Sequence, residues 1–125
     1  MEKLVATVPE RIWSEGRPPS AETWEAEFNV ASWVRIRGGN SEMQLLVCHS
    51  DASGEQRALV DRVLLDGDGS ALMSGMVRLR FQGDVKEVEI RLRVSEPGLE
   101  YKVDELFFQR RGSVLAGQEK LISNF

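Results

Sequence analysis

The chain has one cysteine and one histidine in 125 residues, and this scarcity excludes several kinds of chemistry. A single cysteine cannot form an internal disulfide. A zinc site built from four Cys and His ligands needs more than Cys48 and His49 supply. No GxxxxGK[ST] or GxGxxG stretch occurs, so the usual phosphate-binding loops are missing too. We therefore expect no enzyme, no metal and no other cofactor.

Long apolar runs are also missing. None approaches the roughly 18 residues of a membrane-spanning helix, and residues 1–10 are too polar for a secretion signal. The 16 Lys and Arg residues are outnumbered by 20 Asp and Glu residues, which gives a formal net charge of −4. That balance disfavours DNA, RNA and anionic membranes, because binding to them depends on excess cations. With 42% hydrophobic residues, the chain predicts one soluble domain, and we expect a bacterial, cytoplasmic setting.

What the sequence does contain is a period-two alternation of apolar and polar side chains, typical of half-buried strands. The alternation runs through residues 24–37. The turn-forming residues 38–41 and the apolar segment 43–48 then predict a first hairpin. Residues 56–65 fit a short helix or a strand, and the strand is slightly favoured because its neighbours are strands.

Residues 76–94 predict a second hairpin, with Gly83-Asp84 at its tip. In that register Arg80 faces Glu87 and Arg78 faces Glu89, so both outward pairs are of opposite charge. A one-residue slip would turn the apolar face toward water, so the register is a sharp prediction.

The last part of the chain changes its spacing twice. Apolar residues from Leu99 lie on one parity, but Leu106 and Phe108 lie on the other, which predicts a bulge near Asp104-Glu105. Residues 113–125 have helical spacing and predict a C-terminal helix.

These elements predict a mainly β fold, an antiparallel β-barrel or β-sandwich of about six strands closed by the C-terminal helix. Residues 1–22 contain the consecutive prolines Pro18-Pro19 and predict an N-terminal arm. Residues 23–125 predict a single β-rich domain.

Three residues on the first long strand are candidates for a protein contact. Trp33 lies on the opposite parity to the inward Val34 and Ile36, so it is predicted to be exposed or to mark a bend, whereas Trp24 has the inward parity. Trp and Arg dominate contact hot spots. Trp33, Arg35 and Arg37 therefore form a candidate contact, although Trp33 could equally pack beneath the N-terminal arm.

Two apparent chemical motifs have simpler interpretations. Cys48 and His49 are adjacent on a predicted strand, so their side chains point to opposite faces and we expect no catalytic pair. Residues 66–70 resemble the start of a calcium loop, but Ala71 and Val77 stand where the loop needs glycine and a bidentate glutamate. A polar turn is the better interpretation.

The order of elements, with Arg11 and Arg17 in the arm and Asp51 and Ser53 after a strand, resembles the PilZ family. The resemblance implies a six-stranded barrel that binds cyclic-di-GMP between an RxxxR motif in the arm and a [DN]xSxxG motif on the barrel. Asp51 and Ser53 match the second motif. The two arginines are six residues apart, and Gln56 stands at the position of the motif glycine.

Three functions follow as alternatives. The first is a non-enzymatic regulatory or adaptor module that acts through protein contacts, as a single chain or as a homodimer. The second is the PilZ-like sensor of a cyclic dinucleotide, which would use Arg11, Arg17, Asp51 and Ser53. The third is a small acidic chaperone for a secreted partner, suggested by the size and the pI of about 5.1.

Overall fold

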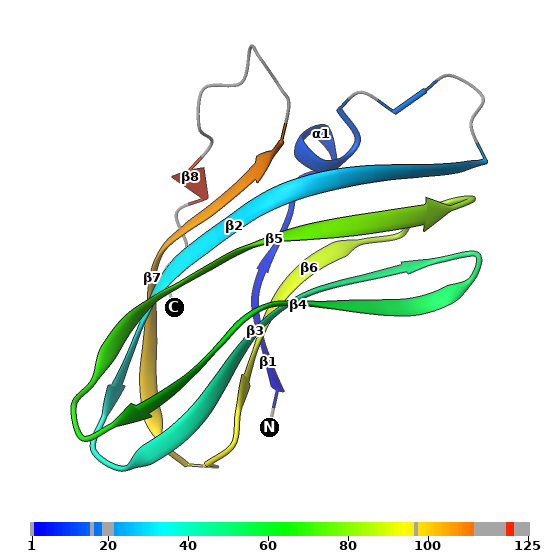
Figure 1. Cartoon of the computed structure of the whole chain (residues 1–125). Coiled ribbons are helices and arrows are strands. Elements are labelled where there is room, and N and C mark those ends of the chain that lie inside the picture. The colour runs from blue at the N-terminus through cyan, green and yellow to red at the C-terminus, as the bar shows by residue number, and fades with distance from the viewer. Residues whose placement is uncertain (1, 16, 19–21, 97, 112–119, 122–125) are drawn as a thin grey trace.

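The computed structural model describes residues 2–15, 17–18, 22–96, 98–111 and 120–121. Its strands are β1 (Glu2–Thr7), β2 (Thr23–Arg37), β3 (Asn40–Asp51), β4 (Gly54–Asp66), β5 (Ser70–Gln82), β6 (Val88–Val94), β7 (Glu100–Arg110) and β8 (Lys120–Leu121), and its helix is α1 (Glu10–Trp13). Within the described residues these strands form two four-stranded antiparallel sheets, ordered β1-β6-β3-β4 and β5-β2-β7-β8 (Figure 1). The mainly β prediction is confirmed, and the arrangement is two sheets rather than a closed barrel.

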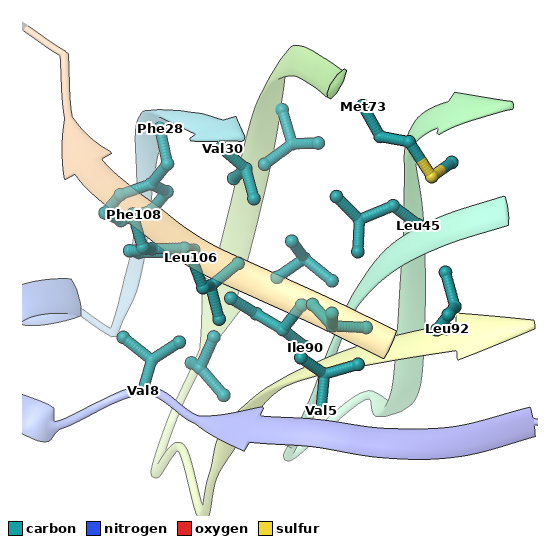
Figure 2. Close-up of a cluster of buried hydrophobic side chains, with 14 of the residues drawn as sticks. Val5, Val8, Phe28, Val30, Leu45, Met73, Ile90, Leu92, Leu106 and Phe108 are labelled. Atoms are coloured by element: carbon teal, nitrogen blue, oxygen red, sulfur yellow. The ribbon is translucent and has the colours of Figure 1, made fainter. Parts of the chain in front are cut away.

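The core lies between the two sheets and follows from the alternation in the sequence. Inward residues of both sheets are almost fully buried, and Figure 2 shows side chains such as Val30, Leu45, Ile90 and Phe108 gathered in one cluster. Phe28 and Phe108 stack with ring centroids 4.7 Å apart. Burial of these apolar surfaces is the main force that holds the sheets together.

The extents of the strands agree with the predictions. β2 covers the predicted strand 24–37, and the ambiguous segment 56–65 lies within the strand β4. The predicted C-terminal helix, residues 113–125, lies mostly outside the described residues. Its residues 120–121 are described, and they form β8, which pairs with β7 instead of continuing a helix.

Both predicted hairpins are wrong in their pairing. β2 pairs with β5 and β7, while β3 pairs with β4 and β6, so the turn after β2 crosses from one sheet to the other. β5 and β6 also belong to different sheets, and Arg80 lies opposite Glu25 of β2 rather than Glu87. The arginines of β5 do face glutamates, but these are Glu25 and Glu27 of β2. The prediction failed because glutamates on two different strands match the spacing of these arginines equally well.

The predicted bulge in β7 is confirmed. The pairing of β2 with β7 shifts register between Ala31 and Trp33, and Glu105 has a φ of 48°. The hydroxyl of Ser32, which points inward, donates to the Asp104 carbonyl at 3.0 Å. The bulge reverses the parity of β7, so Val103, Leu106 and Phe108 all reach the core.

The facing edges of the two sheets meet where β4 approaches β5. Val60 is the extra residue of a bulge in β4, and a Cβ added at Gly75 of β5 would lie only 2.3 Å from the Val60 carbonyl oxygen. Asp61 accepts a hydrogen bond from the Ser74 N–H at 3.0 Å at the same point. Glycine is required here because the two backbones pass too close for a side chain.

The predicted N-terminal arm contributes to the same core. β1 pairs with β6 at the edge of its sheet, and Val5 and Val8 are buried. In α1, Ile12 and Trp13 are buried, and the ring of Trp13 lies 5.6 Å from that of Phe81. The described part of the arm thus packs on the sandwich along β6 and against Phe81 near the end of β5.

Candidate functional site

The outer surface of the β5-β2-β7 part of one sheet gathers the predicted contact residues, and we call it the β2 face. It consists of outward side chains on three adjacent strands, paired in register across the sheet. They are Glu27, Asn29, Ala31, Trp33, Arg35 and Arg37 of β2, Ser70, Leu72, Ser74, Met76 and Arg78 of β5, and Glu100, Lys102, Asp104, Phe107 and Gln109 of β7. Val34 and Ile36 between them point inward and are fully buried.

Apolar side chains concentrate in the middle of the β2 face. Trp33 is 45% exposed, Leu72 48% and Met76 46%, and these are three of the six large hydrophobic side chains that are exposed among the described residues. Trp33 and Leu72 are direct partners in the ladder between β2 and β5. An exposed apolar cluster of this kind commonly marks an interaction surface.

A row of hollows follows β2 along this face. The largest has a volume of about 560 Å³ and is bordered by Ala31, Ser74, Met76 and Phe107. A second, of about 430 Å³, lies beyond Trp33 beside Arg35, and a third, of about 400 Å³, lies between Arg37 and Tyr101. Trp33 therefore projects between two hollows, since the small side chains of Ala31 and Ser74 leave space next to it.

Charged side chains surround the apolar middle. Arg35 pairs with Asp104 at 2.9 Å, and Lys102 lies 3.5 Å from the same carboxylate. Those contacts, the Arg35 hydrogen bond first, lower the pKa of Asp104. At the other end Arg78 and Arg111 pair with Glu27 at 2.7 and 3.5 Å, and the Arg78 hydrogen bond lowers the pKa of Glu27. The face thus combines an apolar centre with a charged rim, as protein interfaces do.

The second predicted site lies at the turn between β3 and β4. The Asp51 side chain is fully buried, and its Oδ1 accepts hydrogen bonds from the backbone and hydroxyl of Ser53 at 2.8 and 2.6 Å. Its Oδ2 accepts from the Gln82 N–H at 2.9 Å. Burial alone would raise the pKa of Asp51, but the hydrogen bonds from Ser53 and Gln82 outweigh it, and the pKa is lowered. This carboxylate acts mainly as an internal clamp on the turn.

The structure brings Asp51 and Ser53 together and places the two predicted arginines in the preceding arm. Arg11 is an exposed residue of α1, and Arg17 is exposed after it, with its N–H bonded to the Ser14 carbonyl. Backbone hydrogen bonds join Gly83 to Glu22 and Ala52 to Gln82. The end of the arm therefore meets the Asp51 turn through the connection that follows β5.

Cys48 and His49 lie on opposite faces of β3. Burial raises the pKa of the Cys48 thiol, whose charged neighbours are Arg57, Glu2 and Arg91 on the outer surface. His49 is buried on the inner side, where its ring lies 4.9 Å from that of Phe81 and its Nε2 lies 3.1 Å from the Arg80 carbonyl. The two side chains do not form a pair. That Cys48 is not a catalytic nucleophile stays a prediction.

Sequence reasoning missed the part of the β2 face that β5 supplies. Leu72 and Met76 are needed for the apolar cluster, and Ser74 and Gly75 for the hollow beside it. A signal was present, because residues 71–77 are apolar or small on both parities, whereas a strand with a solvated face alternates. The neighbours of Trp33, however, depend on the pairing of β2 with β5, which the predicted hairpins had assigned otherwise.

No protein family, no curated protein and no solved structure matches the chain. In the part of the chain that the structure describes, no helix is long and apolar enough to cross a membrane.

Proposed function

We propose that this chain is a non-enzymatic adaptor or regulatory module that binds protein through the β2 face. The observation that supports this most directly is the apolar cluster of Trp33, Leu72 and Met76 beside a hollow of about 560 Å³. A partner side chain that enters the hollow would contact Met76 and Phe107, which line it, and a partner surface around that side chain would cover the neighbouring Trp33 and Leu72. Burial of apolar surface yields roughly 25 cal/mol per Å², so such a cluster can supply the centre of an interface.

The charged rim supports the same function. Arg35 and Arg37 lie next to Trp33 on one strand, and Arg35 is already oriented by Asp104 at 2.9 Å. An oriented guanidinium loses less side-chain entropy when a partner carboxylate approaches it. Rim charges mainly set specificity and association rate, while the apolar centre sets the lifetime of the complex.

The test compares two exposed hydrophobic residues on opposite sheets. Trp33→Ala removes the centre of the β2 face, whereas Leu64→Ala removes a 78% exposed side chain from β4 in the other sheet. With the tagged full chain as bait in a lysate of its source cells, we expect a stoichiometric bound protein that Trp33→Ala loses and Leu64→Ala retains. Equal binding by both variants would assign the contact to another surface and contradict the proposal.

A second candidate function is cyclic-dinucleotide sensing of the PilZ type. Its support is a pair of backbone hydrogen bonds that link the arm to the Asp51 turn. The Gly83 N–H donates to the carbonyl of Glu22 at the end of the arm, and the Ala52 N–H donates to the carbonyl of the adjacent Gln82. Because Asp51 is used inside the protein, Arg11, Arg17 and Ser53 would carry the ligand contacts. Calorimetry with cyclic-di-GMP tests it: micromolar affinity that Arg17→Ala lowers by more than about tenfold supports sensing, and no heat at a ligand concentration of about 0.1 mM opposes it.

A further inference from the structure

We propose that the protein bound by the β2 face is a second copy of this chain, arranged about a two-fold axis; this inference rests on the proposed protein-binding function. The face carries a projection and a hollow side by side. Trp33 projects with Leu72, and the hollow of about 560 Å³ lies over Ala31 and Ser74, the next outward positions on the same two strands. A surface that pairs with itself needs such a projection and hollow within one patch.

One placement of the axis joins the two features. If it lies parallel to the sheet, perpendicular to β2 and above Ser32, it exchanges outward residues equally distant from Ser32. Trp33 of each copy then lies over Ala31 of the other, where the hollow is, and Leu72 lies over Ser74. The contact forms twice, as a closed two-fold dimer requires.

The same axis also brings opposite charges together at the ends of the face. One end carries Arg78, Glu27 and Arg111 in a row across β5, β2 and β7, since Arg78 pairs with Glu27 in register and the Arg111 N–H bonds to the Glu27 carbonyl. The other end carries Asp68, Arg37 and Glu100: Glu100 pairs with Arg37, and Asp68 accepts a hydrogen bond from Gly38. We call these rows the basic end and the acidic end.

Because this axis keeps each strand opposite its own counterpart, the ends match position by position. Arg78 of one copy lies opposite Asp68 of the other, Glu27 opposite Arg37, and Arg111 opposite Glu100. Every one of these pairs is of opposite charge. A two-fold axis parallel to the strands would place each end over itself and bring arginines together on at least the central strand, so the charge pattern selects the perpendicular axis.

The size of the face suits a reversible dimer. From Glu27 to Arg37 it spans about 34 Å at about 3.4 Å per residue, and three strands about 4.8 Å apart give a width of about 14 Å. Two copies therefore cover about 950 Å², at the lower limit of specific interfaces. We expect a dissociation constant on the order of 10 μM, so that monomer and dimer exchange.

Sedimentation equilibrium of the full chain between about 1 and 200 μM tests the association. We expect the mean mass to rise from monomer toward dimer, and Trp33→Ala to raise the dissociation constant at least about tenfold. Leu64→Ala, the matched control on the other sheet, leaves it unchanged. A wild-type chain that stays monomeric throughout, or a dimer that Trp33→Ala does not weaken, overturns the inference.

A charge exchange tests the axis itself. Glu100→Arg places arginines opposite Arg111, and Arg111→Glu places glutamates opposite Glu100, so each variant alone should dimerise at least about fivefold more weakly. Mixed in equal amounts, the two variants form both contacts with opposite charges, and we expect a heterodimer near wild-type affinity. A mixture no stronger than either variant alone overturns this axis, provided that circular dichroism shows both variants folded.

Failure of self-association can be distinguished from failure of the proposed adaptor function. If the chain is monomeric but captures a different protein through Trp33, self-association is wrong and the adaptor function remains. If neither self-association nor Trp33-dependent capture occurs, both are wrong.

Discussion

The two outer faces of the sandwich differ in how well they bury the outward apolar side chains of an inner strand, β3 in one sheet and β2 in the other. On the β1-β6-β3-β4 sheet, Leu46 and Cys48 point outward from β3, yet Leu46 is 7% exposed and Cys48 2%. On the β5-β2-β7 sheet, the outward Trp33 is 45% exposed. Both faces have charged residues on the neighbouring strands. The difference in exposure therefore depends on whether those charged side chains lie across the apolar ones.

On the first face, charged side chains lie across the apolar ones. Arg57 is paired with Glu2 and Glu55, and Arg91 with Glu89 and Glu2, and we call this network the ion-pair cover. Arg57 and Glu89 flank Cys48 in the two ladders of β3. On the β2 face, Arg78 instead pairs with Glu27 at one end. Arg35 pairs with Asp104 beside Trp33, which nevertheless stays 45% exposed. Long charged side chains can cover apolar ones. Here they cover the outward apolar residues of β3 but not Trp33 of β2, while Leu4, Leu59 and Leu64 on the edge strands of the first face stay exposed.

The largest expected effect is on stability, from shortening one apolar side chain on each face. Leu46→Ala should lower the free energy of unfolding by about 2–3 kcal/mol, because the leucine is buried under the ion-pair cover. Trp33→Ala should change it by less than about 1 kcal/mol, because the tryptophan is half exposed. Urea titrations at low protein concentration measure both values, with an unchanged m-value as the control. Equal losses would mean that the faces are equally closed.

A smaller effect should follow from opening the cover itself. Arg57→Ala removes the guanidinium beside Cys48, and we expect a thiol reagent to label native Cys48 about tenfold faster. A tenfold rate corresponds to a free energy of local opening that is about 1.4 kcal/mol lower. Arg62→Ala is the matched control, since Arg62 lies on the same strand but pairs with Glu42 at 3.8 Å. Unchanged labelling in Arg57→Ala would show that neighbouring strands, not the ion pairs, protect the thiol.

The smallest expected effect is the pH dependence of the stability contributed by Asp104 on the β2 face. The pKa of Asp104 is lowered by its hydrogen bond from Arg35, so its ionised form favours the folded state. That contribution is present above the ordinary aspartate pKa of about 3.8 and is lost as the pH falls through the lower folded value. Asp104→Asn should therefore have a slightly lower urea midpoint than wild type at pH 6, and the difference should disappear near pH 2–3. A difference that persists in acid would assign the effect to packing.

The sequence predicted the strands better than their partners. Period-two alternation located β2, and the parity change at Leu106 located the β7 bulge, because each is a property of one strand alone. The strand at β4 was favoured over a helix only because its neighbours are strands. Both hairpins were wrong because pairing is a choice among strands. Arg80 could face Glu87 or Glu25, and local charge does not distinguish them.

For the candidate site too, the sequence predicted features of single strands but not contacts between strands. The exposure of Trp33 and Arg35 follows from their parity on β2, and both are exposed. Leu72 and the hollow beside it arise from the pairing of β2 with β5, a contact between distant parts of the chain. Residues that share a strand were accessible to sequence reasoning, and residues that share only a surface were not.

The connections that cross between the sheets have a consequence for how the chain folds. β2 and β3 are neighbours in sequence but lie in different sheets, as do β4 and β5, β5 and β6, and β6 and β7. Neither sheet can therefore assemble from one continuous part of the chain, and a cut at the turn 67–69 would leave two fragments that each hold strands of both sheets. Folding must wait for distant segments to meet, which places it in the slow range of about milliseconds to seconds. Unfolding should in turn be a single cooperative transition, with no half of the sandwich surviving alone.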